Sequence, residues 1–182
     1  MAGSGRDAPW HAWLARSANW HMIDEIDLVA TISAQSDWLR LCTRLEALAD
    51  RLPAMLPHAE TASVRVALRR GADGADAFIT LAETFFGRQM GSPLAYSLIG
   101  HVAARHAART VQAHDLIEAL GLPAAKALDA ETIGYMLRCF FEGCRQIVAL
   151  ERLTLLELGA ERLTAAARAL VTERIIECCE AG

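Results

Sequence analysis

The sequence predicts an all-α protein, an up-down-up-down four-helix bundle with an extra N-terminal segment and a C-terminal helix. Alanine and leucine, both strong helix formers, supply much of a hydrophobic content of 53%. Four long segments carry apolar residues at spacings of three and four, as a helix with one buried face does. Short connections containing proline or glycine favour antiparallel neighbours. We therefore divide the chain into an extension, residues 1–29, and a bundle with its C-terminal helix, residues 30–182.

Two helical segments are predicted in the first half of the chain. The first covers residues 32–52 and is stopped by Pro53, which cannot continue a helix. The second covers residues 60–86, with a kink or short break between Gly71 and Gly74. We interpret the two glycines as an interruption of one long element and not as a domain boundary.

Two further long segments are predicted in the second half. Ser92 offers a capping hydroxyl and is followed by proline, so a helix is expected over residues 93–120. Asp129 is placed to cap the fourth helix, whose apolar pattern covers residues 133–158. The four segments together predict the bundle.

Shorter helical patterns lie at both ends of the chain. Trp10, Trp13 and Trp20 recur at near-helical spacing. One interpretation is a lid packed over the end of the bundle, and the other is a docking surface, because tryptophan is enriched in binding hot spots. Near the other end, Thr164 can cap a fifth helix over residues 165–178.

Composition excludes several classes of function. A formal net charge of −4 argues against a general nucleic-acid binder, which needs a basic face. No apolar run is long enough to span a bilayer, and no secretion signal is recognised at the N-terminus. The cysteines are odd in number and lack C-x-x-C spacing, so we expect free thiols in a cytoplasmic protein. These cysteines are Cys42, Cys139, Cys144, Cys178 and Cys179.

Two polar residues fall on faces that the pattern predicts to be buried. Glu151 lies four residues after Ile147 and four before Leu155, on the apolar stripe of the fourth helix. His106 lies on the inward face of the third helix. A single inward histidine is typical of a core residue whose ring nitrogens have hydrogen-bond partners. A histidine on one helix and a carboxylate on the next is also half of the arrangement by which bundles hold two metals. The outward positions of the fourth helix are expected to be solvated charges: Arg138, Glu142, Arg145 and Arg152.

Three segments resemble those of hemerythrin-like (HHE cation-binding) domains. Residues 145–163 are similar to the family's last core helix, approximately R-H-x-x-x-E-E-x-x-L-L-P-L-A. Residues 34–42 resemble its A-E-H-x-R-Q-R-x-L-C opening, and residues 104–109 its E-H-x-x-D segment. The resemblance implies a four-helix bundle that holds a non-haem di-iron centre, used for oxygen binding, oxygen or iron sensing, or redox chemistry.

Most of the family's metal ligands are replaced in this chain. The resemblance keeps only His106 and Glu151 as ligand positions. Hydrocarbon cannot donate lone pairs to a metal, and aliphatic side chains would fill the former site instead. The resemblance therefore implies the fold while arguing against the di-iron cofactor. The positions that lose a ligand are Ser36, Ala77, Leu81 and Ile147, and the register of the second helix is the least constrained.

Our leading hypothesis is a non-catalytic binding or regulatory protein without a cofactor. In it, His106 and Glu151 form a buried hydrogen-bonded pair, joined by Thr110 or Ser36. The partner is a protein, a second copy of the chain, or a small apolar ligand in the remaining cavity, and neither a nucleic acid nor a membrane. The alternative hypothesis is an atypical non-haem iron protein that binds oxygen or senses oxygen, iron or redox state. Its iron would use the same pair together with a carboxylate such as Glu83 or Asp76.

A hydrolase triad from Ser36, His106 and Glu151 is not supported by the sequence. No strained nucleophile turn and no oxyanion hole accompany these residues. The sequence likewise has no glycine-rich phosphate loop, no H-E-x-x-H motif and no EF-hand loop. We therefore assign no catalytic residue.

Overall fold

The computed structural model describes residues 22–54, 57–74, 76–87, 92–122 and 128–180, and within these ranges the chain is all-helical. None of the described helices is long and apolar enough to cross a membrane. A parallel β-bridge joins Ile23 to Leu163, and the Ile23 amide donates to Arg162 O at 2.8 Å. The helices are α2 Glu25–Ala49, α3 His58–Asp73, α4 Ala77–Phe86, α5 Pro93–Ala119, α6 Ala130–Leu158 and α7 Ala165–Glu180.

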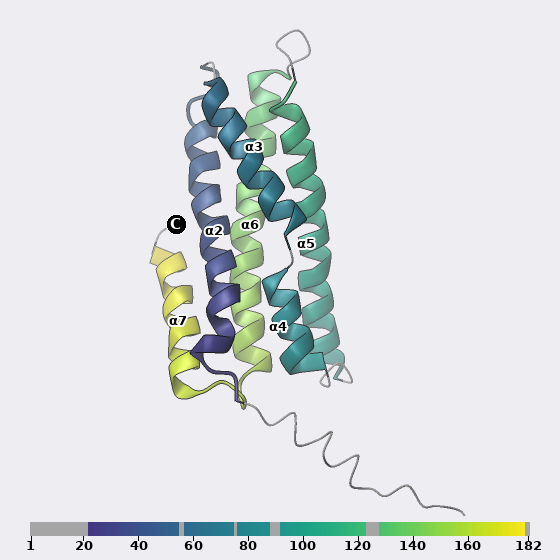
Figure 1. Ribbon diagram of the computed structural model, residues 1–182, viewed down its shortest axis with the longest axis vertical. Helices are drawn as coiled ribbons and strands as arrows, with labels where there is room; N and C mark the ends of the chain where they lie inside the picture. Colours follow the sequence, from purple (N-terminus) through teal and green to yellow (C-terminus); the bar gives the residue numbers. More distant parts are fainter. Residues whose placement is uncertain (1–21, 55–56, 75, 88–91, 123–127, 181–182) are drawn as a thin grey trace, which may run out of the picture.

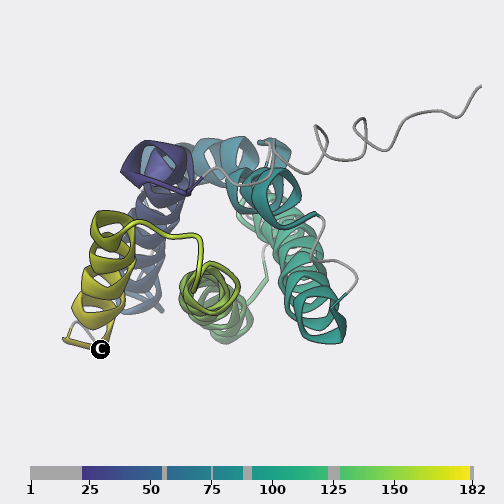
Figure 2. The same cartoon turned by 90° about the horizontal axis from the view of Figure 1, so that it is seen from below.

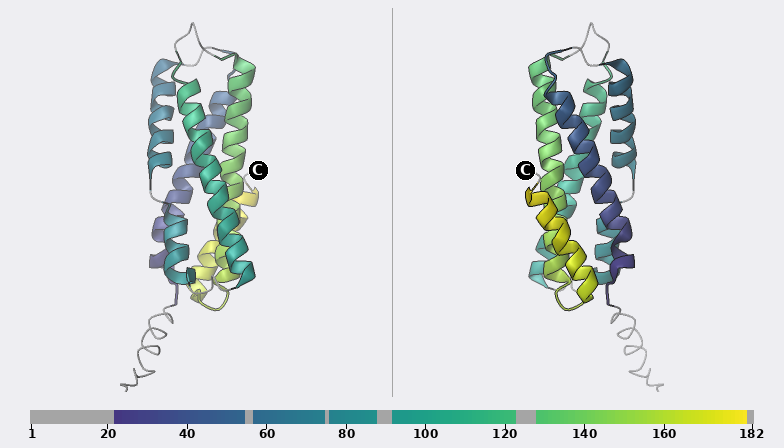
Figure 3. Two further views of the ribbon diagram at one scale, coloured as in Figure 1. Left: turned by 90° about the vertical axis from the view of Figure 1, so that its right-hand side faces the viewer. Right: turned by 90° about the vertical axis from the view of Figure 1, so that its left-hand side faces the viewer.

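The helices lie roughly along one long axis (Figure 1). α2 and α5 run in one direction, α6 runs in the other, and α3 and α4 follow one another along the length of the molecule (Figures 1 and 3). α6 packs against α2, α5 and α7, while α3 and α4 each pack against α2 and α5. Seen from below, α7 and α5 lie on opposite sides of α6 (Figure 2). α6 is therefore covered by other helices on several sides.

α2 begins earlier than the apolar pattern predicted. Asp24 and Asp27 form a capping box, in which Asp24 Oδ1 accepts from the Asp27 amide at 3.1 Å and Asp27 Oδ2 accepts from the Asp24 amide at 3.0 Å. Ile23 and Leu28 are fully buried. The boundary that we placed between residues 29 and 30 therefore falls inside α2.

The predicted interruption near the two glycines is confirmed as a break between two helices. α3 ends at Asp73, and Gly74 follows it in an extended conformation. Asp76 then caps α4, because its Oδ1 accepts from the Ile79 amide at 3.1 Å. The break therefore places a carboxylate at the middle of the molecule's length.

The caps predicted at Asp129 and Thr164 are confirmed, whereas the cap at Ser92 is not, and α2 ends at Ala49, three residues before the predicted end. Asp129 caps α6 and accepts from the Thr132 amide at 2.7 Å, and Thr164 Oγ1 accepts from the Ala167 amide at 3.1 Å. Ser92 occupies the cap position of α5 without a side-chain hydrogen bond to the helix, so its predicted capping hydroxyl is wrong. The proline at the start of α5 is as predicted.

The apolar core consists of two clusters with polar residues between them. The upper cluster contains Leu45, Leu68 and Phe140, and the lower one contains Phe78 and Leu155. Between them along the helices lie buried and partly buried polar side chains, which we call the polar layer. Burying such groups is costly unless they find partners, so this layer requires an explanation. Its members are Gln35, Asp76, His106, Arg109, Glu151 and Arg152.

Candidate functional site

The polar layer brings together the two residues singled out by the sequence. His106 and Glu151 are 8% and 3% exposed, and His106 Nε2 lies 2.7 Å from Glu151 Oε1. The geometry of this contact is not that of a hydrogen bond, and Nε2 has no hydrogen-bond partner among the described residues. The contact between the two side chains is therefore electrostatic. The histidine therefore keeps a buried ring nitrogen whose hydrogen-bonding capacity is not fully used.

The side chain of α2 that contacts this pair is Gln35, which bonds to Glu151, and not Ser36. Gln35 Nε2 donates to Glu151 Oε2 at 2.8 Å. Ser36 Oγ donates to Ile32 O on its own helix at 2.8 Å, which accounts for its hydroxyl. Ser36 is thus wrong as a linker, because the inward face of α2 lies one residue earlier than the alignment placed it, while a link through Thr110 stays a prediction.

Asp76 completes the group on the other side of the imidazole. Its Oδ2 contacts His106 Nδ1 and lies 3.6 Å from Arg109 Nη2. The alignment had assigned the second-helix ligand positions to Ala77 and Leu81. Leu81 instead lies in the lower apolar cluster, and the carbonyl of Ala77 accepts from Thr31 Oγ1 at 3.3 Å. The carboxylate that enters the layer therefore comes from the cap of α4.

Two arginines border this group. Arg109 Nη2 lies 2.8 Å from His106 Nδ1, and its guanidinium stacks 4.3 Å from the centroid of the Trp38 ring. Arg152, which we expected to be solvated, is 3% exposed, and its Nε donates to Gln35 Oε1 at 2.9 Å. Arg152 also donates to the carbonyl of Arg174, because α7 covers this side of α6.

These contacts change the pKa values of His106 and Asp76. Burial acts to lower the pKa of His106, but the close contacts with the Asp76 and Glu151 carboxylates outweigh it and raise that pKa above its ordinary value. Burial acts to raise the pKa of Asp76, but its contacts with His106, the Ile79 amide and Arg109 hold that pKa below the ordinary value. Both shifts favour an ion pair between the two side chains.

A cavity of about 40 Å³ lies beside these side chains. Asp76, His106 and Glu151 border it, and we call these three residues the inner site. One ligand atom from each lies within 4.8 Å of the others, so the group can hold a metal ion. One imidazole nitrogen and two carboxylate oxygens suit iron, zinc or manganese. A cavity of this size has room for very few water molecules or one ion.

The inner site does not fit a pair of iron ions. Ala77 and Phe78 contribute hydrocarbon to the lining of the cavity. Arg109 adds a positive charge next to Asp76. A di-iron centre needs several more nitrogen and oxygen ligands than the three residues supply.

The remaining sequence candidates do not join the inner site. Glu83 is exposed on α4 and does not belong to the group of residues whose atoms lie close enough together to hold a metal ion. Cys42 and Cys144 are buried free thiols, and Cys139 is an exposed one. The other predicted positions, Trp10, Trp13, Trp20 and the side chains of Cys178 and Cys179, lie outside the described residues.

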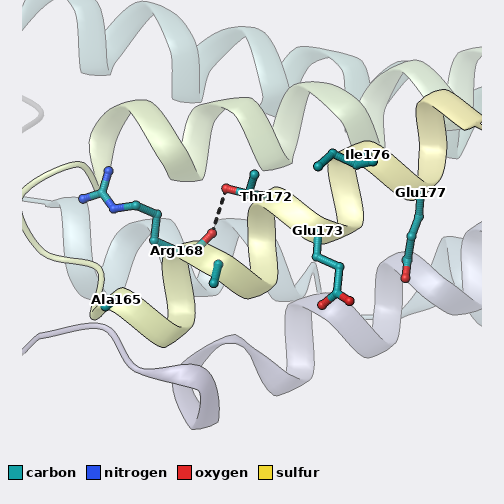
Figure 4. Close-up of a pocket in the computed structure, with 7 residues that line it drawn as sticks. Ala165, Arg168, Thr172, Glu173, Ile176 and Glu177 are labelled. Carbon is teal, nitrogen blue, oxygen red and sulfur yellow. Dashed lines mark hydrogen bonds between the residues drawn. The ribbon is translucent and has the colours of Figure 1, made fainter.

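A second depression runs along α7 alone (Figure 4). It is bordered by side chains such as Arg168, Glu173 and Ile176. Thr172, in the same row, donates its hydroxyl to the carbonyl of Arg168 on the same helix at 2.9 Å. Because a single helix forms it, this surface brings no side chains together from different elements. We assign it no function.

Sequence reasoning found His106 and Glu151 and named Asp76 as one of two candidate carboxylates beside them, but it missed Gln35 and Arg109 as partners. The capping pattern at Asp76 was the one available signal for that carboxylate. Comparisons with family models, with curated proteins and with solved structures find no match to this chain. The function is therefore argued from the inner site itself.

Proposed function

We propose that this protein binds one divalent transition-metal ion in the inner site. The observation that carries the proposal is the convergence of Asp76, His106 and Glu151 on one small cavity, with one ligand atom of each within 4.8 Å of the others. The residues come from three different segments of the chain, the cap of α4, α5 and α6. Such a donor set favours iron, zinc or manganese over calcium or magnesium, because imidazole is a nitrogen ligand.

The proposed fold is a hemerythrin-like four-helix bundle. Its members would be α2, α3 with α4, α5 and α6, with α7 as an addition. The alternating helix directions in Figure 1 and the packing of α6 against α2 and α5 support this interpretation. The resemblance of the helical segments supports the family assignment. We propose one ion and not two, because the hydrocarbon of Phe78 and the guanidinium of Arg109 border the site and cannot donate ligand atoms to a second metal ion.

The chain's own residues would hold the ion in distinct ways. His106 must be neutral at the nitrogen that binds, so binding would displace a proton from the imidazole. Gln35, which donates to Glu151 Oε2, would keep that carboxylate oriented. A transition metal with three protein ligands keeps open coordination positions, which suit a small ligand such as dioxygen or a redox-sensing role.

A second candidate is a metal-free binding or regulatory module, and Arg109 favours it. Its guanidinium lies 3.6 Å from Asp76 Oδ2 and 2.8 Å from His106 Nδ1, so the carboxylate already has a positive partner. In this interpretation the polar layer is a closed network of side chains. The two candidates differ in whether a metal ion displaces the proton of His106.

Metal titration of the chelator-treated full chain tests the proposal. Isothermal titration calorimetry with Zn²⁺, Mn²⁺ and, without oxygen, Fe²⁺ is expected to show one ion per chain. Glu151→Gln, which keeps the side-chain shape, should weaken binding roughly 100-fold, which corresponds to about 3 kcal/mol. Asp76→Asn should have a similar effect.

Glu83→Gln is the matched control, because it removes an exposed carboxylate of α4 outside the inner site. Its affinity should equal that of the wild type. Binding that is equally strong in Glu151→Gln and in the wild type would overturn the proposal. Absence of binding by the folded wild-type chain would favour the metal-free module, and two iron ions per chain would favour the di-iron centre.

A further inference from the structure

A groove between α2 and α3 lies next to the inner site but is separate from it. Its volume is about 450 Å³, within the usual range of small-molecule pockets. The two helices pack side by side (Figure 1). Apolar surface comes from Trp38, Leu41 and Ala67, and positive charge comes from Arg40 and Arg44 of α2 and Arg70 of α3. We call this the α2–α3 groove.

The charge of the α2–α3 groove is opposite in sign to that of the chain as a whole. The protein carries a formal net charge of −4, whereas three arginines and a single acid, Asp37, border the groove. Asp37 pairs with Arg40. Arg44 donates to Ser63 Oγ at 3.0 Å, and Arg70 makes no ion pair with any described residue. Positive charge therefore remains available at the groove.

Trp38 forms the wall between the groove and the inner site. Its ring borders both the groove and the small cavity, as do Gly71 and Gly74. A Cβ atom added at Gly71 would lie 2.5 Å from Cη2 and Cζ2 of Trp38, so only glycine allows the ring to lie against α3. The ring also contacts the guanidinium of Arg109 and the ring of Phe140. An occupant of the groove would thus press on a ring that already touches the polar layer.

We propose that the α2–α3 groove binds a small organic anion, an apolar ring system that carries one carboxylate or phosphate group. The ring system would pack on Trp38 and Leu41, and arginine side chains would bind the anionic group, since the guanidinium fork matches both oxyanions. This proposal does not rest on metal binding at the inner site. It can therefore be tested on metal-free protein.

Calorimetry on the chelator-treated full chain tests it with three probes of one ring system. Naphthoate and naphthyl phosphate represent the two anions, and naphthyl methanol is the neutral analogue. At least one anion should bind at least about tenfold more tightly than the neutral probe, equivalent to about 1.4 kcal/mol. The tighter of the two anions identifies the head group. Equal affinity for all three, or binding of none, overturns the proposal.

Substitutions locate the binding. Arg70→Gln should weaken binding of the preferred anion about tenfold. Arg69→Gln removes the same charge from the preceding residue of α3, which does not border the groove, and should leave the affinity unchanged. Gly71→Ala should also reduce affinity, because the new methyl group displaces Trp38. Gly100→Ala, at an open position of α5, is its control. Equal losses in Arg69→Gln and Arg70→Gln would overturn the location.

Discussion

At His106, each ring nitrogen faces a carboxylate while the ring itself is buried. Nε2 lies 2.7 Å from Glu151 Oε1, and Nδ1 contacts Asp76. Phe78 lies nearly parallel to the ring, with centroids 6.4 Å apart. A buried charge without a partner is far more costly than a paired one. The residues of this group therefore depend on one another more than apolar core residues do.

Removal of the imidazole should be much more damaging than removal of the Ser36 hydroxyl. His106→Ala leaves Asp76 and Glu151 without their shared partner, and we expect a loss of about 3 kcal/mol in the free energy of unfolding. Ser36→Ala removes only a bond to Ile32 O within α2, and the loss should stay below about 1 kcal/mol. Urea unfolding of both variants measures the difference. Equal losses would contradict the role of His106.

The stability of the metal-free protein should depend on pH through the same residue. The pKa of His106 is raised above 6.5 in the folded state, so protonated His106 stabilises the fold at pH values below 6.5. This contribution is lost as the pH rises through the raised pKa. The lowered pKa of Asp76 acts in the opposite sense, so its contribution is lost as the pH falls through that lower pKa.

We therefore expect the free energy of unfolding of chelator-treated protein to decrease as the pH is raised above 6.5. His106→Gln should have a flatter profile over the same interval, since the titrating group is absent. Urea unfolding at a series of pH values gives both profiles. Parallel profiles in the wild type and the variant would assign the pH dependence to other groups.

At the scale of the helices, Arg152 connects three of them. Its guanidinium bonds to Gln35 of α2 at 2.9 Å and to the Arg174 carbonyl of α7, while its backbone belongs to α6. α7 packs against α6 and α2 and also buries Ala167 and Val171. The hydrogen bonds of Arg152 thus add to the apolar contacts by which α7 packs against α6 and α2.

Arg152→Met should loosen α7 while the longer helices stay folded. The methionine can keep apolar packing but cannot donate to Gln35 or to the Arg174 carbonyl, and we expect a loss of about 1–3 kcal/mol. Hydrogen exchange should become faster in the amides of residues 168–177. Arg138→Met, an exposed arginine of the same helix, is the control. Unchanged exchange in α7 would show that its apolar contacts alone hold it.

The sequence predicted the helices well and the inner site in part. Apolar periodicity and capping residues located Asp129, Thr164 and the break near Gly74, because these are local signals. His106 and Glu151 followed from the same periodicity. Asp76 could be named only as one of two candidate carboxylates, because a break of extended backbone resets the helical phase and leaves the register of the next turn undetermined. Gln35 and Arg109 take their roles from contacts between helices, which no single segment encodes.

For the molecule as a whole, the polar layer divides the core into two apolar clusters. An ion bound there would contact residues of α5, α6 and the cap of α4 at once. Because a ligand that binds only the folded state stabilises it, bound metal should raise the melting temperature of the whole chain.

At a free metal concentration about 100 times the dissociation constant, the stabilisation should be about 2.7 kcal/mol, or roughly 5–10 °C for a chain of this size. Calorimetric melting of the wild type with and without Zn²⁺ measures the shift. Glu151→Gln, with its roughly 100-fold weaker affinity, should gain only about 0.4 kcal/mol, or roughly 1 °C, at the same metal concentration. A similar shift in Glu151→Gln would place the stabilising ion elsewhere on the protein.

Asp76 links the interior to the surface through the first turn of α4. One of its oxygens accepts from the Ile79 amide, and the other faces His106. A ligand or ion in the inner site that pulls this carboxylate inward would weaken the cap of α4. The first turn of α4 would then fray, so the exposed surface would differ between the filled and the empty site. A short helix end could thus serve as the readout by which another protein distinguishes the filled from the empty form.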